Sequence, residues 1–116
     1  MKKLVPKRKM RIKLVPMELQ ARIPHLYAQE KLSDPVAVLR LFDPCSRFSF
    51  YVFEGCRKPD GDLKLFGYIR SHVGPDCDGF GETSLRELES IPGLGLGLAR
   101  DPLFRSARLS EIRGWS

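Results

Sequence analysis

The side chains that could bind a metal or attack a substrate are few and widely spaced in this chain. They comprise three cysteines and two histidines, Cys45, Cys56, Cys77, His25 and His72. A structural zinc site needs four ligands, usually in short paired spacings, and the chain has no Cys-x-x-Cys pair. Nucleophilic catalysis needs a Cys or Ser beside a His that a third group orients, and no spacing unites either histidine with a cysteine. We therefore expect no metal site and no catalytic residue, and we interpret the thiols as buried or idle.

Two pairs of carboxylates have a spacing that would suit general acid and base catalysis. Asp60 with Asp62 and Asp76 with Asp78 both lie in segments rich in Gly and Pro. Aspartate is favoured there because its side chain hydrogen-bonds to the nearby backbone. We therefore assign both pairs to turns, and we predict that the protein is not an enzyme and has no cofactor.

Glycines alternate with leucines from Gly93 to Leu98, a pattern that invites comparison with phosphate-binding loops. A dinucleotide-binding loop has glycines at its first, third and sixth positions, but the sixth residue counted from Gly93 is Leu98. The chain also lacks the Gly-Lys-Ser or Gly-Lys-Thr of a P-loop. The segment is therefore predicted to be a connecting loop.

The positive charge of the chain is concentrated at its start. The 116 residues have a net charge of +6, yet residues 14–116 alone have a net charge of −1. The difference lies in seven basic residues without an acid, Lys2, Lys3, Lys7, Arg8, Lys9, Arg11 and Lys13. We expect a flexible basic arm over residues 1–13 and a single domain over residues 14–116. The arm would contact nucleic-acid phosphates without reading base sequence.

The first residues also leave the start of translation open. Lys-Leu-Val-Pro occurs at residues 3–6 and again at residues 13–16. A start at Met10 would remove five basic residues and lower the net charge to +1.

Composition favours a soluble, cytoplasmic protein. Its hydrophobic fraction of 42% suffices for a core. No run approaches the about 18 apolar residues of a membrane-spanning helix. Lys and Pro interrupt the start too often for a signal peptide. The odd number of cysteines indicates a reducing compartment.

The apolar pattern predicts an α+β fold. Strands are expected over residues 36–42, 48–53 and 63–73, and the short turns between them indicate an antiparallel meander. A helix over residues 17–32 should break at Pro24. We expect three or more strands, with one or two helices packed on one face of the sheet.

A second helix is predicted to begin at Ser84, because Ser84 and Glu87 have the spacing of a capping box. Pro92 and Gly93 should end this helix. The tail, residues 103–115, is predicted to form a short helix or strand.

Seven of the eleven aromatic residues fall between residues 42 and 68, namely Phe42, Phe48, Phe50, Tyr51, Phe53, Phe66 and Tyr68. Exposed aromatics on a sheet can stack on RNA bases. A small sheet needs the same side chains for its core, and we favour the core. The exception is the outward face of the second strand, with Tyr51 and Phe53. If no helix covers that face, it would mark a partner site.

Several segments together are characteristic in type and order. They are Arg22-Ile23-Pro24-His25-Leu26-Tyr27 with Gln29-Glu30, Phe48-Ser49-Phe50-Tyr51 closed by Glu54, Phe66-Gly67, Ser84-Leu85 with Glu87-Leu88-Glu89, and Arg100-Asp101 before Phe104. Over about residues 14–111, the chain resembles domain-of-unknown-function family 2958. Family members typically have tryptophans at the positions of Phe48 and Phe50, so the chain resembles a diverged member. The resemblance implies an origin in plasmids, integrating elements or phages, and no established activity.

Two classes of function remain. We favour a non-enzymatic protein-interaction module of mobile-element origin that blocks a host defence complex, of the anti-CRISPR or antirestriction type. Its partner surface is expected to include Tyr51, Phe53, Glu54, Arg100 and Asp101. The alternative is a nucleic-acid-binding protein or regulator that uses the basic arm. The oligomeric state is left open.

Overall fold

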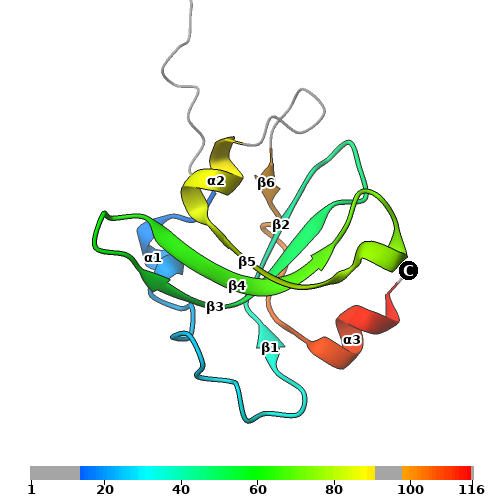
Figure 1. Cartoon of the computed structure of the whole chain (residues 1–116), viewed down its shortest axis with the longest axis horizontal. Helices are drawn as coiled ribbons and strands as arrows, with labels where there is room; N and C mark the ends of the chain where they lie inside the picture. The colour runs from blue at the N-terminus through cyan, green and yellow to red at the C-terminus, as the bar shows by residue number, and fades with distance from the viewer. Residues whose placement is uncertain (1–13, 91–97, 116) are drawn as a thin grey trace, which may run out of the picture.

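The structure is a computed structural model that describes residues 14–90 and 98–115. Its centre is a five-stranded antiparallel sheet in the order β5-β4-β3-β2-β6 (Figure 1). The strands are β2 (Leu39–Phe42), β3 (Ser49–Arg57), β4 (Leu63–Arg70), β5 (Gly79–Ser84) and β6 (Ala99–Arg100). A second sheet pairs β1 (Val36–Ala37) with β7 (Ala107–Arg108). The remaining elements are α1 (Met17–Gln20), η2 (Pro75–Cys77), α2 (Leu85–Ser90) and α3 (Leu109–Gly114).

Strands β2 to β5 form the expected meander, because each pairs antiparallel with the next along the chain. The segment predicted as one strand over residues 36–42 is divided between β1 and β2, which belong to different sheets. Strand β3 runs on to Arg57, four residues beyond the strand predicted over residues 48–53, so the turn before β4 is short. Gly61 provides the positive φ of 89° that this turn needs.

The central strand β3 is buried on both sides. Phe50 and Val52 pack into one buried cluster, which contains Leu88 of α2 and is flanked by Leu19 of α1. Tyr51 and Phe53 pack into a second cluster on the other face. The molecule therefore has three layers, with the sheet in the middle.

The α+β fold class is confirmed. Helices α1 and α2 pack on one face of the sheet, and α3 adds cover on the opposite face, where Leu109 and Ile112 join the second cluster. The predicted capping box of α2 is confirmed. The Glu87 N–H donates to Ser84 Oγ at 3.2 Å, and the Ser84 N–H donates to Glu87 Oε1 at 3.3 Å. No helix of the described chain is long and apolar enough to cross a membrane.

Candidate functional site

The predicted partner surface on β3 is wrong, because the C-terminal segment covers it. Tyr51 and Phe53 are only 4% and 1% exposed. The ring of Tyr51 lies 5.9 Å from that of Phe104 and 5.8 Å from that of Trp115, centre to centre. Phe53 packs edge-on against Phe80 of β5. Tyr51 and Phe53 therefore belong to the core. The prediction required that no helix cover this face, and helix α3 does cover it.

Glu54, also predicted to lie on the partner surface, is buried at 5% exposure. Its Oε1 accepts a hydrogen bond from the N–H of Tyr27, and its Oε2 accepts one from the N–H of Gln29, both at 2.8 Å. Between them the chain turns sharply, since Tyr27 has a φ of 69°. Glu54 thus stabilises a strained turn and cannot contact a partner.

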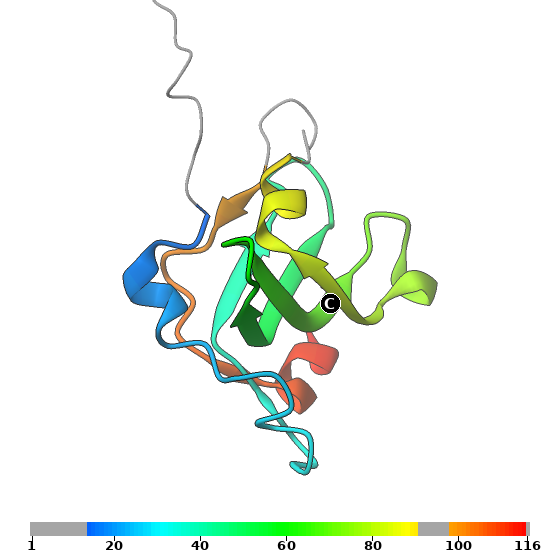
Figure 2. The same ribbon diagram turned by 60° about the vertical axis from the view of Figure 1, so that its left-hand side comes forward.

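Arg100 and Asp101, the other two predicted partner residues, line a groove of about 290 Å³. The groove lies between α1 and the segment that follows β6; Figure 2 shows the two side by side, α1 in blue and the segment in orange. Its basic lining is Arg22, Arg100 and Arg105, and its apolar lining is Leu19, Val38, Leu39, Pro102 and Phe104. The described lining thus combines four charged with five apolar side chains.

The described lining of the groove is electropositive, because Asp101, its one carboxylate, already forms an ion pair with Arg40. Asp101 Oδ2 lies 3.0 Å from Nη1 of Arg40, and its Oδ1 accepts the N–H of Leu103 at 2.9 Å. By contrast, none of the three arginines of the groove forms an ion pair with another residue of the described chain. Their positive charges are therefore not neutralised by a carboxylate of the described chain.

The start of the described chain also meets the groove. Arg100 Nη1 donates to the carbonyl oxygen of Leu14 at 2.9 Å. The predicted basic arm immediately precedes Leu14 in sequence, but its residues 1–13 lie outside the described part of the structure. Most of the Gly-Leu segment, residues 93–97, and the predicted helix end at Pro92 lie outside it too.

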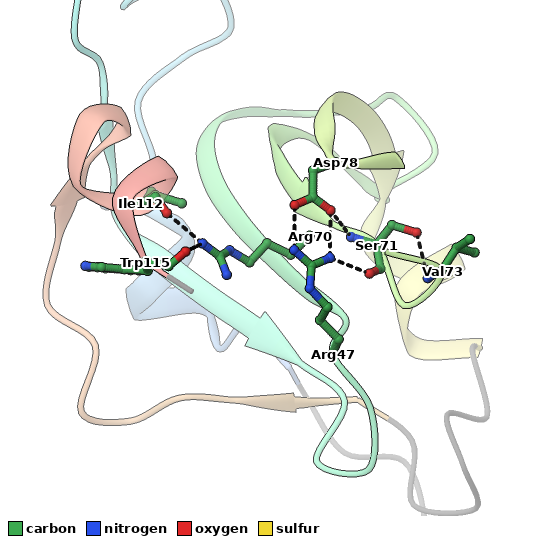
Figure 3. A network of polar contacts seen from close by, with 7 residues as sticks. All are labelled: Arg47, Arg70, Ser71, Val73, Asp78, Ile112 and Trp115. Carbon is green, nitrogen blue, oxygen red and sulfur yellow. Dashed lines mark hydrogen bonds and ion pairs between the residues drawn. The ribbon is translucent and has the colours of Figure 1, made fainter. Parts of the chain in front are cut away.

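A second polar cluster, formed by Arg47, Ser71 and Asp78, stabilises the loop between β4 and β5 (Figure 3). Arg47 binds both carboxylate oxygens of Asp78, at 2.8 and 2.7 Å, and Asp78 also accepts the N–H of Ser71 at 2.8 Å. The hydrogen bond from Arg47 lowers the pKa of Asp78 to about 2. Every partner here belongs to a turn or strand end, as the assignment of Asp78 to a turn predicts.

Arg70 extends this cluster to the C-terminal helix. Its Nη2 donates to the carbonyl oxygen of Ile112 at 2.8 Å and also to that of Trp115 (Figure 3). A cation at the C-terminal end of a helix is stabilising. Arg70 therefore fixes α3 against the sheet.

The other carboxylate pair also serves a turn. Asp60 Oδ1 accepts the N–H of Asp62 at 2.9 Å, and Asp62 Oδ1 accepts the N–H groups of Leu63 and Arg86 at 2.7 and 3.1 Å. Burial raises the pKa of Asp62, but the hydrogen bonds from Leu63 and Arg86 outweigh burial and leave it below its ordinary value. Asp60 thus stabilises the turn, and Asp62 also binds the first turn of α2 through the N–H of Arg86.

The thiols and imidazoles do not converge. Cys45 and Cys77 are exposed and Cys56 is half-buried, all as free thiols. Within residues 14–90 and 98–115, no three His, Cys, Asp or Glu side chains are placed to hold a metal ion together.

The chain belongs to the family of proteins of unknown function DUF2958, whose family model matches residues 14–113. This match confirms the resemblance drawn from the motifs. The comparisons with curated proteins and with solved structures find no match.

Sequence reasoning identified part of this groove and missed the rest. Arg22 and Phe104 belong to segments that carry the family resemblance, so a signal for them was present. Arg105 had none, because only the fold brings it close to α1.

Proposed function

We propose that the protein is a non-enzymatic protein-interaction module and that its binding surface is the groove between α1 and residues 100–105. The observation that carries this proposal is the set of three arginines, free of ion pairs with other described residues, around an apolar floor. Arginine and aromatic residues are enriched at protein interfaces. Leu103, beside the groove, is 84% exposed and adds apolar surface for a partner.

The chemistry of the lining supports binding rather than catalysis. Among the described residues that line the groove there is no Ser, Cys, His or Lys, so a carboxylate is the one group there that could serve as a nucleophile or general base. Its only carboxylate, on Asp101, is paired with Arg40. Such a groove can hold and orient a partner.

We further propose that the partner is a host defence complex. Support comes from the mobile-element origin that the family resemblance implies. A protein that imitates DNA needs a strongly acidic surface, whereas residues 14–116 have a net charge of only −1, so we do not propose that this protein imitates DNA. We therefore propose that the protein inhibits the complex by binding one of its subunits through the groove.

A second candidate function is nucleic-acid binding. The observation in its favour is the contact of Arg100 with Leu14, because the seven basic residues of the arm precede Leu14 directly. Seven phosphate contacts would give a salt dependence with a slope of at most about −6. Such binding would be weak and nonspecific, so we rank it second.

Affinity capture separates the two functions. The tagged full chain is incubated with a lysate of its host, with and without nuclease treatment, and bound proteins are identified by mass spectrometry. A protein-interaction module retains its partner after nuclease treatment. Loss of every specific partner after nuclease treatment would contradict the proposal and favour the nucleic-acid function.

A further inference from the structure

We infer that the groove binds an acidic peptide segment, with partner carboxylates on Arg22 and Arg105 and an adjacent apolar side chain on the floor beside Phe104. This inference rests on the proposed function and deepens it by naming the chemistry of the partner segment.

The charge of the groove selects an anion. Of the four charged residues in its lining, three are arginines, and the fourth, Asp101, is neutralised by Arg40. Arg22 and Arg105 are exposed, so their planar guanidinium groups can each take a carboxylate through two parallel hydrogen bonds. Arg100 is held by the carbonyl oxygen of Leu14 and adds its positive charge from a fixed position.

The apolar lining of the groove favours a partner with an apolar side chain next to its carboxylate. Leu19, Val38 and Leu39 line the groove, and a volume of about 290 Å³ is small for an organic ligand but ample for one or two side chains. The exposed Leu103 extends the apolar surface beyond the groove. A segment that alternates acidic and apolar residues matches both features.

The same surface is poorly suited to nucleic acid. Proteins that hold single strands offer exposed aromatic rings on which bases stack. Among the described lining residues Phe104 alone is aromatic, and its ring is packed against Tyr51 in the core. We therefore assign the groove to a peptide rather than to a polynucleotide.

Fluorescence anisotropy with the full chain tests this assignment. The probe is a fluorescein-labelled peptide Glu-Glu-Leu-Phe-Glu-Glu at about 150 mM salt. Control peptides replace each Glu by Gln, or Leu-Phe by Ser-Ser, and an oligo(dT) of the same charge is the nucleic-acid control. Because charged and apolar contacts both contribute, each control should bind at least about tenfold more weakly than the probe.

Matched variants locate the binding. Arg22→Gln and Arg105→Gln should each weaken binding of the probe by about tenfold. Arg113→Gln, which changes an exposed arginine of α3 on the opposite face of the sheet, should leave it unchanged. Because Arg22 and Arg105 are exposed, their variants should unfold at the same temperature as the native chain, and Arg113→Gln, which loses a cation–π contact with Tyr68, should unfold within a few degrees of it.

Three results would overturn the inference: no binding of the probe, equal binding of the Glu and Gln peptides, or tighter binding of oligo(dT) that depends on Arg22 and Arg105. Failure of this inference can be distinguished from failure of the proposed function. If the peptides fail while a nuclease-resistant partner is lost from the Arg22→Gln variant, the groove still binds a protein, but one of different chemistry.

Discussion

Asp101 and Arg40 are joined twice, once through their side chains and once through their backbones. The side-chain ion pair measures 3.0 Å, and the N–H of Asp101 donates to the carbonyl oxygen of Arg40 at 2.9 Å. This double link fixes the segment after β6 to β2, and that segment forms one wall of the groove. The rigidity of the proposed binding surface therefore depends on Asp101, a lining residue whose carboxylate is held by Arg40.

The first prediction concerns this link. Asp101→Asn removes the ion pair but keeps an oxygen for the N–H of Leu103, so the free energy of unfolding should fall by about 1 kcal/mol. Asp60→Asn is the matched control, because Asp60 also accepts a backbone N–H and pairs at 3.7 Å with an exposed arginine, Arg86. Its effect should stay below about 0.5 kcal/mol. Equal losses in urea titrations of the two variants would contradict the role of Asp101.

A second prediction tests the register of the sheet. A Cβ at Gly67 would lie 2.0 Å from the carbonyl oxygen of Tyr51, so Gly67→Ala forces β4 away from β3. We expect a loss of at least about 3 kcal/mol or failure to fold. Gly79→Ala, in the neighbouring strand β5, meets nothing within 4 Å and should cost little. Thermal unfolding by circular dichroism compares them, and a stable Gly67→Ala variant would show that the register is wrong.

The third prediction is a pH dependence. The hydrogen bond from Arg47 lowers the pKa of Asp78 from 3.8 to about 2. A lowered pKa in the folded state stabilises the fold above the unfolded value, and this contribution is lost as the pH falls from about 4 to about 2. Asp78→Asn should therefore lose less stability than the native chain over that range. Carboxyl NMR resonances of Asp78 that titrate near pH 4 would refute the Arg47 pairing.

The fourth prediction separates the arm from the groove. Deletion of residues 1–9 should leave the fold and partner binding intact while it abolishes weak nucleic-acid binding, because it removes five of the seven basic residues of the arm. Gel-shift titrations at two salt concentrations compare the full and shortened chains. Tight, salt-resistant and sequence-selective binding by the shortened chain would promote the nucleic-acid function above ours.

Local patterns in the sequence predicted the features that depend on neighbouring residues. The apolar run around Phe50 predicted a strand, and Ser84 with Glu87 predicted the start of a helix. Both are confirmed, because strand formation and helix capping depend largely on residues a few positions apart. The turn aspartates Asp60 and Asp62 belong to the same class of prediction.

Features that depend on distant residues were missed. Nothing near Tyr51 indicates that Trp115 will cover it, since this contact spans half of the chain. The groove could not be predicted for the same reason, because Arg22 and Arg105 come to line one groove only when β6 pairs with β2. Strand β5 was not predicted from the sequence, because glycines stand at positions where a strand usually alternates apolar and polar residues. Gly81 pairs with Gly67, and a Cβ on Gly81 would lie 2.8 Å from the side chain of Ile69.

The central claim is that the groove around Arg22, Arg100 and Arg105 binds a protein. Its most direct test is quantitative capture from nuclease-treated host lysate, comparing the native chain with the Arg22→Gln/Arg105→Gln double variant and with Arg113→Gln. We predict that the partner bound by the native chain is retained by Arg113→Gln and reduced at least about tenfold by the double variant. Equal recovery of the partner by all three chains would contradict the claim.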